Sequence, residues 1–162
     1  GQIALAGGAY AEAQQCLQES VALFRAAGQR DEEGVVLAEL GHAALRLGQR
    51  SQAQQHLCAA LRRAAEIGAF LPTISSLATV ALLLADRGEA ERAVELYALA
   101  SRYPTIGNSR YWEDIAGRPI AAVAATLPPE VATAAQERGR ARDVGATLTE
   151  LLVELEAQPD GR

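Results

Sequence analysis

Apolar residues recur along this chain at the three- and four-residue spacing of an amphipathic α-helix. Residues 31–47 show this pattern and end at Gly48, which is typical of a helix C-terminus. Residues 51–68 repeat the pattern, and we expect Ser51 to cap the start of that helix. Together the two segments predict a helical hairpin that buries one apolar face.

A short phrase that opens the second helix of this hairpin occurs three times, at a spacing of 40 residues. Each copy has a glycine followed five residues later by an alanine, in the pairs Gly8 and Ala13, Gly48 and Ala53, Gly88 and Ala93. Gly28 and Gly68 follow the same period, with Asn108, which also tolerates a left-handed helix end, in the third place. A fixed period of this length is the signature of stacked helical hairpins.

The period ends near Tyr103, and helices without the repeat pattern follow. We expect one helix capped by Asn108 or Ser109, and later helices over 129–138 and 143–157. Because a helical array needs a terminal unit with one polar face, these helices are predicted to close it. The chain is then expected to consist of helical hairpins over 1–103, of which the first is truncated, a helical C-terminal cap over 104–157 and a disordered tail over 158–162.

The residues of the hairpins follow a recognisable order. In the second hairpin this order is Leu37, Leu40, Gly41, Ala53, Leu57 and Ala60. It resembles the tetratricopeptide repeat, in which a large residue and a Leu-Gly pair precede an alanine, an aromatic residue and a second alanine. The matching packing positions elsewhere are Ala13, Leu17, Leu77, Ala93, Tyr97 and Ala100. The resemblance covers residues 1–103 and implies an all-α, right-handed superhelix of stacked hairpins.

The chain departs from this family in two ways. Leucine replaces the aromatic residue at its first position, and the period is 40 residues instead of about 34. The longer form resembles the repeats of bacterial maltose-regulator-like transcriptional activators and signalling ATPases. This resemblance implies a cytoplasmic protein, and we expect the chain to be an excised C-terminal piece of a larger regulator.

In repeats of this kind, the first helix of each hairpin lines a concave groove that holds peptide ligands. The resemblance therefore implies a groove formed by Val35, Ala38, His42, Arg46, Ser75, Ala78, Leu82 and Asp86. His42, Arg46 and Asp86 would supply its polar specificity. The alternative is that these residues form an ordinary solvated helix face.

Four of the seven aromatic residues fall within a short segment of the sequence, namely Tyr97, Tyr103, Tyr111 and Trp112. Such a cluster can be the centre of a protein interface. It can equally seal the junction between the regular hairpins and the C-terminal cap, because each aromatic ring buries a large apolar area. We favour the seal.

The charge and the reactive residues narrow the function classes further. A net charge of −5, with arginine as the only basic residue type besides histidine, argues against a nucleic-acid partner. No apolar run is long enough to span a membrane. Cys16, Cys58, His42 and His56 are not arranged as a metal site. Because no nucleophile–base pair or sheltered carboxylate pair is apparent, we predict no enzyme activity and no cofactor.

These observations predict a non-catalytic domain for protein interaction or regulation. Its partner would be a protein, a peptide or a sibling domain of the same parent chain. One alternative is a structural module that forms homo-oligomers through Ile3 and Leu5 at an uncapped N-terminal end. Another is a small-molecule sensor with a pocket near His42 and the aromatic cluster.

Overall fold

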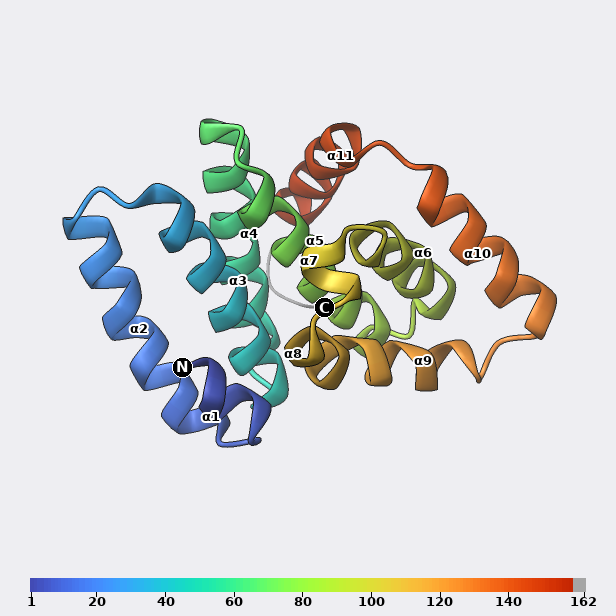
Figure 1. Ribbon diagram of the computed structural model, residues 1–162, viewed down its shortest axis with the longest axis horizontal. Helices are drawn as coiled ribbons and strands as arrows, with labels where there is room; N and C mark the ends of the chain where they lie inside the picture. The colour runs from blue at the N-terminus through green and yellow to red at the C-terminus, as the bar shows by residue number, and fades with distance from the viewer. Residues whose placement is uncertain (159–162) are drawn as a thin grey trace.

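The computed structural model describes residues 1–158, and every regular element within them is helical (Figure 1). The all-α prediction is therefore confirmed for this part of the chain. The helices are α1 (Gln2–Ala6), α2 (Tyr10–Ala26), α3 (Arg30–Arg46), α4 (Arg50–Ile67), α5 (Phe70–Asp86), α6 (Ala90–Ser101), α7 (Pro104–Gly107), α8 (Arg110–Trp112), the π-helical turn η1 (Glu113–Gly117), α9 (Arg118–Ala124), α10 (Pro129–Ala141) and α11 (Val144–Ala157).

Glycines in the left-handed conformation end the first five helices, at a spacing of 20 residues. Their φ angles lie between +62° and +82°, at Gly8, Gly28, Gly48, Gly68 and Gly88. At each one the following backbone N–H donates to a carbonyl five residues earlier, which satisfies an otherwise free group at the helix end. The 40-residue period in the sequence is therefore two helix-and-turn units of 20 residues.

Two of the predicted helix ends are wrong. Asn108 has a φ of −102°, so it does not continue the series of left-handed residues. Ser51 lies inside α4, whose N-cap is Gln49. Ser109 does cap α8, because its side chain accepts a hydrogen bond from the backbone N–H of Trp112. The periodic pattern shows where a helix lies, but the residue at which it begins or ends depends on the local backbone conformation.

Consecutive helices from α2 to α6 pack against one another, and α3 also contacts α5 (Figure 1). Small residues permit this close approach: a Cβ atom on Gly41 of α3 would lie 2.8 Å from Leu57 of α4. All the predicted packing positions are buried except Tyr97, which is half-buried; the buried ones are Ala13, Leu17, Leu37, Leu40, Gly41, Ala53, Leu57, Ala60, Leu77, Ala93 and Ala100.

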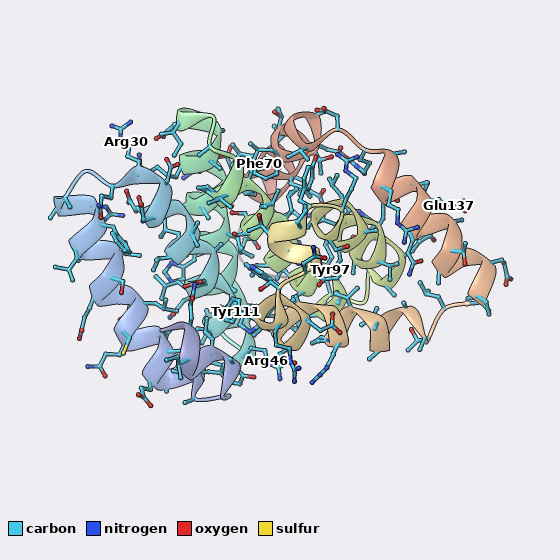
Figure 2. All side chains as sticks on the ribbon, viewed as in Figure 1. Arg30, Arg46, Phe70, Tyr97, Tyr111 and Glu137 are labelled. Atoms are coloured by element: carbon cyan, nitrogen blue, oxygen red, sulfur yellow. The ribbon has the colours of Figure 1, made fainter. Side chains whose placement is uncertain are left out.

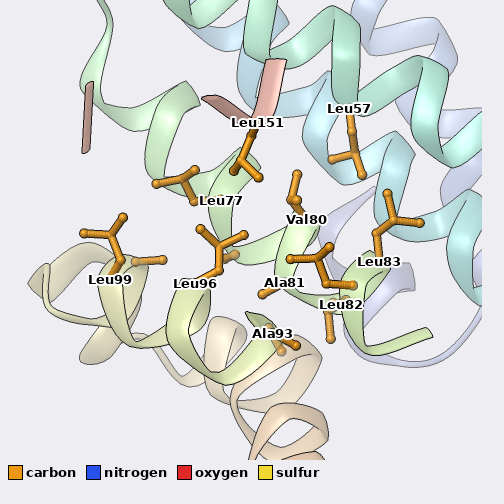
Figure 3. Close-up of a cluster of buried hydrophobic side chains, with 14 of the residues drawn as sticks. Leu57, Leu77, Val80, Ala81, Leu82, Leu83, Ala93, Leu96, Leu99 and Leu151 are labelled. Atoms are coloured by element: carbon orange, nitrogen blue, oxygen red, sulfur yellow. The ribbon is translucent and has the colours of Figure 1, made fainter. Parts of the chain in front are cut away.

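The C-terminal helices extend the core without continuing the hairpin pattern. Helix α10 packs on α6, while α11 returns to contact α4 and α5. Leu151 of α11 joins the buried leucines of α5 and α6 in the larger of two hydrophobic clusters (Figure 3). The side chain of Gln54 also donates a 2.7 Å hydrogen bond to the Leu155 carbonyl, which ties α11 to α4.

The predicted tail over 158–162 falls almost entirely outside the described residues. Gln158, the last of these, is held in place because its side chain accepts a 3.0 Å hydrogen bond from Arg87. Residues 159–162 lie outside the described part of the chain.

Candidate functional site on the face of α3 and α5

Helices α3 and α5 carry the eight residues predicted to form a groove, and we call this surface the groove face. Only three of the eight are accessible: Val35 is half-buried, and Arg46 and Asp86 are exposed. The other five are buried, namely Ala38, His42, Ser75, Ala78 and Leu82. The prediction of an open groove is therefore wrong for these five positions, and an ordinary solvated face is equally excluded there.

The chain itself fills the middle of the groove face. Residues 104–124, which we call the covering segment, include α7, η1 and α9, and all three contact α5. The π-helical turn η1 also contacts α1. Tyr111, next to η1, lies where α8 approaches α3 and packs against both hydrophobic clusters (Figure 2). The covering segment thus occupies the position predicted for a peptide ligand.

A buried carboxyl group lies beneath the covering segment. The Glu39 side chain on α3 accepts a 2.6 Å hydrogen bond from Gln2 of α1. Burial raises the pKa of Glu39, although the bond from Gln2 opposes this effect. Burial and the nearby Glu39 also raise the pKa of Tyr111 above its usual range. In this environment the Tyr111 phenol stays protonated, and the Glu39 carboxyl group ionises less readily than an exposed one.

His42 is held neutral in the same region. It lies against the Tyr10 ring of α2 in an edge-to-face contact, with 6.2 Å between the ring centres. Burial, with a smaller contribution from the charge of Arg46, lowers the pKa of His42 to about 4. The buried Nδ1 atom of His42 makes no hydrogen bond to any residue in 1–158. His42 is thus a packed imidazole and not the exposed groove residue that the sequence predicts.

One open cavity remains at the Arg46 end of the groove face. It has a volume of about 440 Å³ and lies between α3, α5 and α9; its lining includes Arg46, Leu82, Asp86, Pro119 and Val123. Both charged side chains already have partners. Arg46 lies 5.3 Å from the centre of the Tyr10 ring and donates to its hydroxyl, while Asp86 pairs with Arg50. The carboxylate in this cavity is therefore already neutralised by Arg50, while Arg46 is held by the neutral Tyr10.

A second cavity opens at the other end, and we call it the Val35 cavity. Its volume is about 240 Å³, and its lining residues come from α1, α2, α3 and α5: Gln2, Phe24, Asp31, Glu32, Val35, Val36, Glu39 and Leu71. The apolar part consists of Phe24, Val35, Val36 and Leu71. Leu71 is 47% exposed although it is a large aliphatic residue. Four apolar side chains from three helices thus meet around accessible space.

Sequence reasoning placed Val35 at this end but missed its neighbours. Phe24 belongs to α2, which the repeat pattern does not assign to the groove, and Leu71 lies on the groove helix α5 but one turn before the first predicted groove residue, Ser75. The packing of α2 and α5 against α3 brings the two side chains together. The available signal was the adjacent pair Phe70 and Leu71, two large apolar residues at the start of a helix. Both are about half exposed in the structure.

The aromatic cluster lies where the hairpins meet the covering segment. Trp112 is buried in the larger hydrophobic cluster, and Tyr97, Tyr103 and Tyr111 pack against it. The ring of Tyr103 also contacts Phe70 edge to face at 4.8 Å. Burial raises the pKa of Tyr97 to about 12. This arrangement agrees with a seal between the two parts of the chain.

A scan against protein-family models found no match for this chain, and searches of the curated proteins and of the solved structures found no significant match. No helix in the described residues is both long enough and apolar enough to cross a bilayer. Within residues 1–158, no three His, Cys, Asp or Glu side chains are grouped as metal ligands would be.

Proposed function

We propose that this chain is a non-catalytic domain that binds a segment of a partner protein, or of a sibling domain, at the Val35 cavity. The observation that carries this proposal is the meeting of Phe24, Val35, Val36 and Leu71 around accessible space. Because the middle of the groove face is filled by the covering segment, a partner would reach this face at its ends, and the Val35 end combines four apolar side chains.

The cavity is suited to binding because well-packed helices form it before any partner arrives. The partner segment then loses conformational entropy on binding, whereas the domain loses little. Each Å² of apolar surface removed from water contributes about 25 cal/mol. Burial of one aliphatic side chain in the cavity would therefore contribute a substantial part of the binding free energy of a complex of moderate affinity.

The wider context of the proposal is a tetratricopeptide-like superhelix from a cytoplasmic bacterial regulator or signalling ATPase. Its support is the 40-residue sequence period and the series of left-handed glycines every 20 residues. In such a parent protein the groove face would receive a segment from a neighbouring domain or from a protein partner. Sibling domains would carry out any catalysis or DNA binding.

Selection of a random peptide library tests this function directly. We expect peptides selected on the wild type to lose most of their binding to a Leu71→Arg variant. A matched control is Val153→Arg on α11, because Val153 is also an exposed apolar residue but does not line the cavity. Failure to select any peptide, or selection of peptides that bind both variants equally, would contradict the proposal.

Self-association is a second candidate, favoured by one exposed side chain. Ile3 on α1 is 91% exposed, and its neighbour Gln2 lines the Val35 cavity. Leu5, in contrast, is buried, which corrects the prediction that both residues form an open end. Light scattering over a hundredfold concentration range tests this candidate. A dimer that disappears in Ile3→Glu supports it, and a monomer at every concentration contradicts it.

A further inference from the structure

We propose that the Val35 cavity selects a partner segment in which an aliphatic residue is flanked by arginine or lysine. This inference rests on the proposed function, because it names the chemistry of the segment that binds at the same cavity. It follows from three features: the size of the cavity, its apolar lining and the unpaired carboxylates beside it.

The size favours a side chain over a free ligand. Cavities that hold drug-sized molecules measure roughly 300 to 1,000 Å³, and the Val35 cavity, at about 240 Å³, lies below this range. Its apolar walls, formed by Phe24, Val35, Val36 and Leu71, suit an apolar occupant. An aliphatic side chain presented by a longer segment fits these conditions, and the segment then supplies further contacts outside the cavity.

Two carboxylates beside these apolar walls are unpaired within the part of the chain that the structure describes. Asp31 and Glu32 line the cavity but form no ion pair with any residue that the structure describes. The adjacent Glu33 shows the contrast, because it pairs with both Arg25 and Arg63. Asp31 and Glu32 therefore leave net negative charge at the entrance of an apolar cavity.

Among residues 1–158, no arginine lines this cavity to balance that charge. Arg30 is the nearest basic residue in the sequence, and its side chain projects outward from the start of α3 (Figure 2). The positive end of the helix dipole accounts for acidic residues in the first turn of α3. The interaction with the helix dipole still leaves the carboxylate oxygens of Asp31 and Glu32 able to accept hydrogen bonds from a cationic partner.

The spacing along α3 places the acidic side chains next to the apolar walls of the cavity. Asp31 precedes Val35 by four residues, and Glu32 precedes Val36 by four, so each carboxylate lies one helical turn from an apolar wall residue. Neighbours at this spacing have Cβ atoms about 5–6 Å apart. A basic residue next to the bound aliphatic side chain is therefore within reach of a carboxylate.

Three labelled peptides of equal length test the inference by fluorescence anisotropy. The first alternates leucine and arginine between Ser-Gly ends, the second replaces arginine with glutamate, and the third replaces leucine with serine. We expect the first to bind about tenfold more tightly than either of the others. We also expect its affinity to fall with added salt, because the selected contacts are ionic.

Variants of the domain then locate the binding. Asp31→Asn combined with Glu32→Gln should weaken the leucine–arginine peptide about threefold to tenfold, as expected for two partly exposed ion pairs. Glu12→Gln combined with Glu19→Gln is the matched control, since both residues are exposed acids on α2 outside the cavity. This control should change the affinity less than twofold, and circular dichroism should show all variants folded.

The outcomes separate the inference from the proposed function. If the leucine–glutamate peptide binds equally well and loses binding to Leu71→Arg, the basic preference is wrong but the cavity still binds a partner. If the leucine–arginine peptide binds the two double variants equally, its attraction is non-specific and the inference is overturned. If no peptide of the three binds, the inference is also overturned, and the library selection decides the proposed function separately.

Discussion

At the scale of single residues, the burial of His42 makes the stability of the fold depend on pH, although the side chain is neutral at pH 7. Its pKa is about 4 in the folded chain and about 6.5 in an exposed reference state. Between these values the unfolded state binds a proton that the folded state does not. Stability therefore falls as the pH decreases from about 6.5 to about 4.

We predict that acidification over this window costs on the order of 3 kcal/mol through His42. Urea unfolding at several pH values measures the loss, and His42→Gln should remove most of it. His56→Gln is the control, because burial also lowers the pKa of His56 but the residue is less deeply buried. A pH dependence that is unchanged in His42→Gln would contradict this assignment.

Glu33 carries a buried charge whose loss should be costly. Its side chain is 2% exposed and pairs with Arg25 at 2.9 Å and Arg63 at 3.1 Å, so it joins α2, α3 and α4. We predict that Glu33→Ala lowers the unfolding free energy by about 2 kcal/mol, since two guanidinium groups lose their shared partner. Glu91→Ala, which breaks an exposed pair with Arg138, should cost less than about 1 kcal/mol. Equal losses in thermal unfolding would refute the distinction.

At the scale of elements, the close contact between α6 and α10 depends on a glycine. A Cβ atom on Gly139 would collide with the Glu95 backbone carbonyl and lie 2.9 Å from the Ala98 Cβ atom. We predict that Gly139→Ala destabilises the fold by about 1–3 kcal/mol, although alanine favours a helix by about 1 kcal/mol over glycine. Denaturant unfolding measures the change.

Gly145→Ala provides the matched control for this prediction. Gly145 is also helical, in α11, but the nearest atom to its added Cβ is a side-chain oxygen of Asp143 at 3.4 Å. This substitution should be neutral or slightly stabilising because only the helix preference changes. Stabilisation by both substitutions would show that α6 and α10 do not depend on the close approach at Gly139.

The helices themselves were largely predictable, and their ends were less so. The 3.6-residue pattern located α3, α4, α10 and α11 to within a few residues of their observed bounds. The Ser51 and Asn108 ends were wrong because capping depends on local backbone geometry that residue type only suggests. The 20-residue spacing of the left-handed glycines was present in the sequence but hidden within the 40-residue period.

At the scale of the whole molecule, the covering segment is the feature that sequence reasoning did not predict. Local periodicity reports which face of a helix is apolar, but not which distant segment covers it. Residues 104–124 fold back over α5 and α1, on the face that carries the predicted groove residues. Sequence reasoning therefore named suitable groove residues without showing that the chain itself occupies the middle of the groove face.

The groove face is thus closed in its middle by the covering segment and open at the Val35 cavity. Thiol labelling distinguishes the two regions, with Cys16 and Cys58 first replaced by alanine. We predict that Val35→Cys reacts rapidly, that a selected peptide protects it, and that Ala78→Cys reacts slowly with or without peptide. Rapid labelling of Ala78→Cys, or a peptide that protects Ala78→Cys while leaving Val35→Cys exposed, would contradict the account.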